Sequence, residues 1–503
     1  MSNIHVHKEE VFTFPQDGSH KDSIGIENGL SNTSSVHHGE VIERPFTTLS
    51  AVGLGHSITN SAMGILIIYP TTIQFGGTPL VFWGYNLMTL VGLCVATSLG
   101  ELASAFPHAG GQYFWVSRLC PEPYRRFLTY FTAIIAWAGA VCTSASVTLA
   151  ISTISMGMYQ YTHPDLVVDR WMIFVGYILV LAATFGFNCF ESLLPKLARF
   201  HLILTVGVTT ATFVCLVAPS KPKGNALDFF VTLHNVSGWP QGVAFLIGLN
   251  GPNWCYSCLD SATHLADEIP HPERNIPKAL LWTIVVSYVT GVIMIIGLGL
   301  AVTDYEAAGN MDLFNYLYNN NQAAALGLVS LMIVSVFFSL VGVHTWQSRL
   351  AWSFSRDGGM PFSKYISRIA PSPFKTPIYA HAYSIAWTLG LGCLYLGSSE
   401  TFGSFVSCGI LCQYISYCIP IALLLYNGRK NITPGPFFHP KLGLVSNIVT
   451  ILWASAALVL YCLPYFLPVT ALSMNYVAPV LIFLFAYAVA FWFLVGKRTY
   501  RCV

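Results

Sequence analysis

The residues best suited to binding a small solute lie in one apolar segment, FLIGLNGPNWCYSCLD, at residues 245–260. Glycine, proline and asparagine interrupt its centre, and two aromatic residues and a carboxylate follow: Trp254, Tyr256 and Asp260. A helix in hydrocarbon must satisfy its own backbone, so an interruption is tolerated only where protein or a water-filled cavity surrounds it. The freed backbone would bind the solute, and the aromatic and acidic side chains would select it.

A second apolar segment, SAVGLGHSITNSAMGILIIYP at residues 50–70, is interrupted in a similar way. Its Thr59, Asn60 and Ser61 would offer backbone carbonyls and side-chain oxygens. The two segments are the first members of two five-span repeats, and paired interruptions at matching positions indicate a transporter's midplane binding site. The alternative is a pair of kinked structural helices that pack through small residues.

The composition indicates a membrane protein. The chain of 503 residues is 54% hydrophobic and 9% charged, whereas a soluble domain carries about 25% charged residues. The formal net charge of +2 argues against a nucleic-acid-binding surface. The 13 cysteines show neither a secreted disulfide framework nor zinc-site spacing, and Cys255 and Cys258 are expected to pack rather than to bind metal.

Charge-free stretches predict twelve membrane-spanning helices. No Asp, Glu, Lys or Arg occurs between Arg44 and Glu101, or between Lys441 and Lys497. Each of these stretches has room for two helices of ~20 residues, and eight single apolar stretches lie between them. With the N-terminus in the cytoplasm, all but three of the 24 Lys and Arg residues fall on the cytoplasmic side, as the positive-inside rule requires.

The sequence divides into three parts. Residues 1–44 are polar and are expected to form a disordered cytoplasmic tail without a cleavable signal peptide. Residues 45–496 form the predicted twelve-span transporter domain, and residues 497–503 form a short cytoplasmic tail.

Three motifs resemble the amino acid–polyamine–organocation permease superfamily: SLGELASAFPHAGGQYFW at 98–115, DEIPHPERNIPKAL at 267–280 and HTWQSRLAWSFSRDGGMP at 344–361. SITNSAMGI at 57–65 and NWCYSCLDSATHLADE at 253–268 are most similar to the fungal amino acid/choline permeases, and among them to choline transporters. The resemblance implies an all-α integral membrane protein of the fungal plasma membrane. Its fold would be leucine-transporter-like, with two inverted five-helix repeats, broken helices one and six, and two peripheral helices.

The same resemblance implies import of choline or a related quaternary amine by alternating access, with a possible coupling proton. The alternatives are γ-aminobutyrate, other amino acids, polyamines or a nitrogenous vitamin, so the substrate is a small cationic or zwitterionic amine. A quaternary ammonium cannot donate a hydrogen bond and is recognised by aromatic faces. Trp254, at the position of an aromatic gate in the superfamily, and Tyr256 are the first candidates for such a cage.

Asp260 has three open interpretations: a countercharge, a proton site, or a hydrogen-bonding support for the unwound segment. The remaining substrate-binding candidates are Thr59, Asn60, Ser61, Trp137, Ser144, Asn253 and Tyr414, with Tyr130, Ser146 and Tyr417 as weaker ones. Glu101 is expected at an inner gate or in a structural role. Arg349 and Arg356 resemble conformational latches, or they only anchor the chain on the positive side of the membrane.

An enzyme or a nutrient sensor is the competing class of function. The chain contains no HExxH motif and no nucleotide-binding loop, and its predicted tails are short. We therefore expect no catalytic residues, no cofactor and no metal ion. His56, His264 and His344 are possible proton carriers, although a single histidine in a helix is more often a packing residue.

Overall fold

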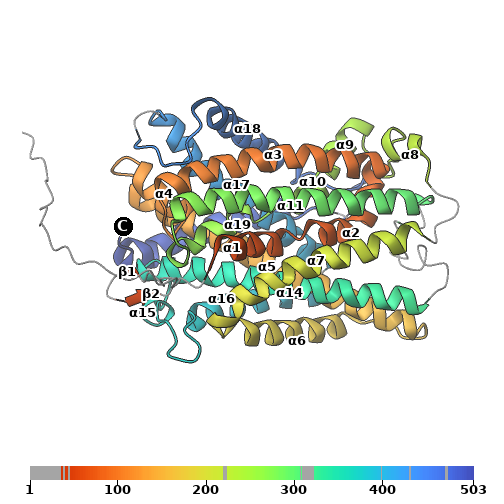
Figure 1. The fold of residues 1–503 in the computed structure, drawn as a ribbon, viewed down its shortest axis with the longest axis horizontal. Coiled ribbons are helices and arrows are strands. Elements are labelled where there is room, and N and C mark those ends of the chain that lie inside the picture. Colours follow the sequence, from red (N-terminus) through yellow and green to blue (C-terminus); the bar gives the residue numbers. More distant parts are fainter. Residues whose placement is uncertain are drawn as a thin grey trace, which may run out of the picture.

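Most helices lie along the long axis of the molecule (Figure 1). The structure is a computed structural model that describes residues 35–37, 40–42, 46–218, 224–305, 308, 322–397, 399–429, 432–470 and 474–502. Within the predicted tail at 1–44, the described parts are two antiparallel strands, β1 (Ser35–His37) and β2 (Glu40–Ile42). The rest of that tail lies outside the described residues.

The bounds of the helices follow in chain order. They are α1 (Thr48–Thr59), α2 (Ser61–Thr72), η1 (Ile73–Phe75), α3 (Gly77–Ala105), α4 (Gln112–Leu119), α5 (Arg125–Thr162), α6 (Arg170–Asn188), η2 (Glu191–Leu193), α7 (Leu194–Val217), α8 (Ala226–Phe230), α9 (Gln241–Gly248), α10 (Asn250–Trp254), η3 (Leu259–Glu268), α11 (Pro272–Ala301), α14 (Gln322–Arg356), α15 (Ser363–Ile366), α16 (Ile378–Gly397), α17 (Ser399–Tyr426), α18 (Pro440–Leu460), α19 (Val477–Phe491), η4 (Trp492–Gly496) and α20 (Lys497–Thr499).

Ten helical stretches of the described chain are long and apolar enough to cross a membrane. They contain the α1–α2 pair, α3, α5, α6, α7, α11, α14, α17, α18 and α19. Two further segments pack among them: α16 lies against α5, α6 and α14, and the interrupted α9–α10–η3 segment lies against α1, α2, α3 and α11. The expectation of an all-helical membrane domain is therefore confirmed, with ten helical stretches long and apolar enough to span a bilayer.

Apolar side chains cover the outside of the bundle. Leu90 on α3, Trp282 on α11 and Leu452 on α18 are each more than half exposed. In water such exposure would cost free energy, whereas the lipid tails of a bilayer are as apolar as these side chains. These residues mark the surface that faces lipid.

The helix α1 lies at the centre of the bundle. It is buried from Ser50 to Thr59 and packs against α7, α11 and α14. A small residue permits the close approach of α7, because a Cβ atom on Gly53 would lie 2.7 Å from the carbonyl oxygen of Ala198. Central burial places the end of α1, where the sequence is interrupted, away from lipid.

The segment 497–502, predicted as a short tail, is packed against the ends of α5 and α14. Tyr500 is buried, and its ring centroid lies 5.5 Å from that of Tyr130 and 5.6 Å from that of Phe354. Arg126 Nη2 on α5 donates a hydrogen bond to Tyr500 O at 2.7 Å. This segment therefore belongs to the folded bundle.

Asp357, directly after α14, is buried where this segment docks, and Arg501 N–H donates to its carbonyl oxygen at 2.9 Å. Burial raises the pKa of the Asp357 carboxyl to about 6, although Tyr113 and Arg356 favour the ionised form. An aspartate in an unfolded chain has a pKa near ~3.9. The folded protein thus binds this proton more tightly, and stability is lost as the pH rises from about 4 to about 6.

We predict that Asp357→Asn removes this loss of stability with rising pH. Between pH 5 and pH 7 the group lowers the stability of the wild type by about 1 kcal/mol, because ionisation is costlier in the folded state. Thermal unfolding midpoints of the purified protein in detergent at the two pH values measure the effect. An identical pH dependence in wild type and variant would contradict the assignment.

Candidate functional site

The two interruptions predicted from the sequence lie against each other. Ser61 Oγ at the start of α2 donates a hydrogen bond to Cys255 O, 2.7 Å away at the end of α10. Gly64 permits this approach, because a Cβ atom there would lie 3.0 Å from Cys255 Sγ. The two broken segments therefore meet, and we call this meeting point of α1, α2 and residues 254–258 the junction.

Asn60 produces the first break. Its backbone is left-handed, with φ 30° and ψ 53°, and its N–H donates to His56 O at 2.7 Å and ends α1. Asparagine is one of the few residues that adopt this conformation readily. Its Nδ2 also donates to Ser339 Oγ at 2.7 Å and to Ser335 Oγ at 3.1 Å. The same residue thus ends α1 and attaches the break to α14.

The second break is a run of turns between Trp254 and η3. Cys258 in this run is also left-handed, with φ 63°. Its N–H donates to Gln413 Oε1 at 2.7 Å, and Gln413 Nε2 donates to Thr143 Oγ1 at 3.1 Å. A side chain of α17 therefore satisfies a backbone group that the broken helix leaves without a partner.

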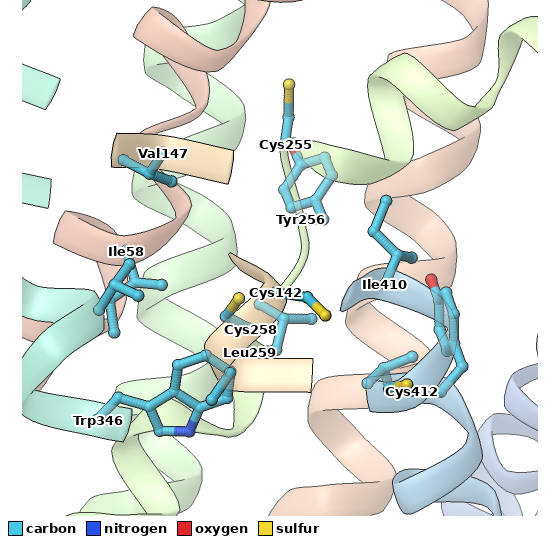
Figure 2. Packing of buried hydrophobic residues seen from close by; sticks show 14 of the residues in the cluster. Ile58, Cys142, Val147, Cys255, Tyr256, Cys258, Leu259, Trp346, Ile410 and Cys412 are labelled. Carbon is cyan, nitrogen blue, oxygen red and sulfur yellow. The ribbon is translucent and has the colours of Figure 1, made fainter. Parts of the chain in front are cut away.

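A small chamber lies at the junction, with a volume of about 30 Å³. This is room for roughly two water molecules. Apolar side chains that include Ile58 and Val147, which lie on one side of the unwound segment in Figure 2, form part of its wall. Its other lining residues include Trp254 and the polar residues Thr59, Asn60, Thr143, Ser257 and Ser339.

A larger chamber of about 600 Å³ adjoins the small one, and small-molecule sites typically measure about 300–1,000 Å³. Residues of α2, α5, α9, α10, α14 and α17 line it, together with the aromatic residues Phe75, Tyr395, Tyr465 and Phe466. It reaches the C-terminal end of α2, which we call the α2 end of the bundle. The opposite end, where α1 begins, is the α1 end.

Trp254 is shared by the two chambers. Together with Ile67 and Ala150 it lines both the small and the large one. No Asp, Glu, Lys or Arg is among the described residues that line either chamber. The site can therefore hold a ligand through aromatic faces, hydroxyl groups and backbone carbonyls, but not through ion pairs with these lining side chains.

The family model for amino acid permeases matches residues 46–486, which includes both broken segments. This chain belongs to the amino acid permease family. The permease is 46% identical over 466 residues to the swainsonine transporter swnT of Arthroderma benhamiae, covering 92% of this chain and 93% of that one. It is 45% identical over 464 residues to the transmembrane transporter swnT of Metarhizium robertsii (91% and 92%). It is 36% identical over 511 residues to the choline transporter of Saccharomyces cerevisiae (100% and 89%).

These relatives identify the permease as a multi-pass membrane transporter and not an enzyme. The similarity to choline transporters expected from the motifs is confirmed. However, both swnT proteins are more similar to this permease than the yeast choline transporter is. The family and the choline-transporter homology are thus as expected, whereas the expected order of similarity is not.

Of the predicted binding residues, Thr59, Asn60 and Trp254 line the small chamber, and Ser146, a weaker candidate, lines the large one. Ser61 instead joins the two breaks, as described above. The remaining candidates have other partners within the fold.

Trp137 and Ser144 on α5 face neighbouring helices. Trp137 Nε1 donates to Ser384 Oγ at 3.1 Å, and Ser144 Oγ lies 2.9 Å from His344 Nε2. Neither residue lines the two chambers. Their hydrogen bonds connect α5 with α16 and α14.

Tyr256, the second predicted cage residue, packs against α3. Its hydroxyl lies 2.7 Å from Thr89 Oγ1 on α3, and its ring stacks on Tyr85 with centroids 5.0 Å apart. It lines neither of the two chambers, and the two-residue cage stays a prediction. The hydrogen bond holds the ring against α3.

Asn253 and Tyr414 pair with each other. Tyr414 OH donates to Asn253 Oδ1 at 2.7 Å, and Asn253 Nδ2 donates to Tyr461 OH at 2.9 Å. These contacts fasten α10 to α17 and to the end of α18. Both side chains have hydrogen-bond partners inside the protein and do not line the two chambers.

Asp260 lies in η3, just after the junction, and is buried in a hydrogen-bonded cluster. Gln112 Nε2 donates to its Oδ2 at 2.7 Å, His264 Nε2 lies 3.1 Å from the same oxygen, and Tyr417 OH donates to Oδ1. It lines neither chamber. The carboxylate joins η3 to α4 and α17.

The predicted gating residues form ion pairs at the α1 end. Arg349 Nη2 lies 2.7 Å from Glu191 Oε2, and Arg349 Nε lies 3.1 Å from Glu268 Oε1. Arg356 Nη2 lies 3.0 Å from Asp267 Oδ2, so two arginines of α14 hold the end of η3. Glu101 on α3 forms a separate ion pair with Arg429.

Several site residues were not found by sequence analysis. Thr143, Ser257 and Ser339 line the small chamber, and Glu191 completes the ion-paired cluster of Arg349. The serines and threonines lie among many others in their segments, so no local signal marks them. Asn250, beside the glycine and proline of the break, carries such a signal and lines the large chamber.

We predict that Asp260→Asn lowers the free energy of unfolding by about 2 kcal/mol, because one of the two buried carboxyl oxygens that accept from Gln112 and Tyr417 is replaced by an NH2 group. Ser261→Ala is the matched control. Ser261 is buried in the same turn, and its hydroxyl has no hydrogen-bond partner. Thermal unfolding in detergent compares the two variants. Equal midpoints for Asp260→Asn and wild type would contradict a supporting role.

Proposed function

We propose that this permease imports choline or a related small hydroxylated amine by alternating access. The observation that carries the proposal is the position of Trp254, which borders both chambers beside the junction. A cationic amine over an indole face gains about 2 kcal/mol when it is desolvated. Choline and swainsonine, for which relatives are named, are both small amines with hydroxyl groups.

The lining side chains of the junction bear on the charge of the substrate. The C-terminal end of α1 and the N-terminal end of α2 meet at the break with opposite partial charges of roughly half an elementary charge, so the helix ends alone do not select the sign. No basic side chain is among the described lining residues to bind a carboxylate. This favours amines over γ-aminobutyrate and other amino acids, which carry a carboxylate.

The proposed fold has twelve spans in a leucine-transporter-like arrangement. Support comes from the ten apolar helical stretches, α16 and the α9–α10–η3 segment, which add up to twelve. The breaks at Asn60 and Cys258 fall in the first and sixth of these spans, as the two inverted repeats require. Cytoplasmic termini, plasma-membrane localisation and proton coupling belong to the same proposal.

The geometry corresponds to one state of an alternating-access cycle. The large chamber reaches the α2 end, whereas the ion pairs Arg349–Glu268 and Arg356–Asp267 hold the α1 end together. Release at the α1 end would require these pairs to separate. In this mechanism Trp254 binds the amine, and the two arginines control the exit.

We predict that Trp254→Ala raises the KM for choline about 10- to 30-fold, because the cation–π contact is lost. Primary amines should be affected less, because they also bind through N–H donors, and Trp254→Phe should retain most of the affinity. The measurement is uptake of labelled choline by yeast cells without their own choline transport. Trp282→Ala, on the lipid-facing side of α11, is the control and should leave KM unchanged.

A competition panel in the same cells tests the substrate class. Unlabelled choline and swainsonine should compete with labelled choline, whereas γ-aminobutyrate, putrescine and common amino acids should not. An equal loss of affinity for quaternary and primary amines in Trp254→Ala would refute the aromatic contact. Absence of choline uptake above that of control cells would refute choline transport.

A further inference from the structure

Arg349 at the α1 end has two carboxylate partners. Its Nη2 donates to Glu191 Oε1 at 2.8 Å and to Glu191 Oε2 at 2.7 Å, and lies 3.4 Å from Glu268 Oε2. Its Nε donates to Glu268 Oε1 at 3.1 Å. The side chain of Arg349 is 2% exposed, and those of Glu191 and Glu268 are 14% and 9% exposed. Two carboxylates therefore share one buried guanidinium.

Glu191 and Arg349 belong to one group of packed helices. Glu191 begins η2 directly after α6, and α6 packs against α5, α14 and α16. Asn188 at the end of α6 accepts a hydrogen bond at 2.8 Å from Thr345 Oγ1 on α14, one turn before Arg349. Glu191 N–H donates to Phe374 O at 3.0 Å, in the segment that leads to α16. The contact between Glu191 and Arg349 thus lies within this group.

Glu268 belongs to a different group. It ends η3, which packs against α1, α3 and α11 as well as against α14. Its carbonyl oxygen accepts a hydrogen bond at 3.4 Å from Phe46 N–H, just before α1. The contact between Arg349 and Glu268 therefore joins two groups of helices. Opening of the α1 end would separate this contact, whereas Glu191 would stay with Arg349.

The second carboxylate changes the free energy of opening. A buried ion pair that loses one partner is strongly destabilised, because the remaining charge has no partner. When Glu268 leaves, Glu191 still neutralises Arg349. In the closed state the two carboxylates compete for one guanidinium, and their repulsion is relieved only when they separate or when one of them takes up a proton. Both effects of Glu191 favour the open state.

We propose that Glu191 is a positioning residue that keeps Arg349 paired while the α1 end opens, and that it thereby sets how readily the permease releases its substrate. This inference rests on the alternating access proposed above. Glu268 has the opposite role, because its contact with Arg349 exists only in the closed state. Removal of the Glu191 charge should favour closure, and removal of the Glu268 charge should favour opening. A purely structural role would give both changes the same sign.

The first test measures opening of the α1 end without a substrate. Spin labels at Ser192→Cys in η2 and Arg274→Cys at the start of α11, two exposed positions, report the distance between the two groups of helices. Pulsed electron paramagnetic resonance is recorded on purified protein without other reactive cysteines. Glu191→Gln should lower the ratio of the longer to the shorter distance about 10-fold, and Glu268→Gln should raise it.

The second test uses uptake of labelled choline in the same yeast cells. Glu191→Gln should lower kcat about 10-fold and leave KM unchanged or lower, because opening slows while the chambers stay intact. Glu191→Asp keeps the charge and should retain kcat within about 3-fold. Glu273→Gln is the matched control and should behave as the wild type, because this carboxylate at the same end lies 3.8 Å from His271 Nδ1 instead.

Three outcomes would overturn the role of Glu191. One is a distance ratio in Glu191→Gln that is unchanged or shifts in the same direction as in Glu268→Gln. Another is a rise in KM without loss of kcat in Glu191→Gln. The third is a Glu191→Gln protein that does not fold, because Arg349 would then need both carboxylates in the closed state. Absence of choline uptake by the wild type would instead refute the proposed function, and the spin-label distances would still test Glu191.

Discussion

The hydrogen bond from Ser61 Oγ to Cys255 O joins two helices at the points where each loses its own backbone hydrogen bonding. In the core of a membrane no bulk water is present to form hydrogen bonds with these backbone groups, so the protein must supply the partners. Gln413 supplies another partner by accepting from Cys258 N–H. Because these contacts keep the breaks stable, polar backbone can exist halfway through an apolar bundle.

Because polar groups need partners within the protein, most polar residues of the broken segment bond to neighbouring helices, and few line the chambers. Asn253, Tyr256 and Asp260 belong to the broken segment, yet each is bonded to a neighbouring helix. Trp254, between them in sequence, is the aromatic residue of this segment that borders the chambers. Most polar groups of the segment thus maintain its irregular shape, and few remain to contact a solute.

Charge is distributed unevenly along the bundle. Arginine–carboxylate pairs hold the α1 end, where Arg349 lies between Glu191 and Glu268. The chamber walls in the described part of the chain carry aromatic and hydroxyl groups instead. A buried charge is tolerated only with a partner, so unpaired carboxylates beside an open chamber would be costly. The proposed recognition of a cation by aromatic rings and carbonyl oxygens would avoid that cost.

The helical membrane architecture, both breaks and the family could be predicted from the sequence, because hydrophobicity, helix-breaking residues and long motifs are local properties. It also singled out Thr59, Asn60 and Trp254, which line the small chamber. The partners of Tyr256 and Asp260, and the place of Thr143 and Ser339 in the chamber wall, became known from the packed helices. These outcomes depend on hydrogen bonds between residues far apart in the chain, and no local pattern records which helix will supply the partner.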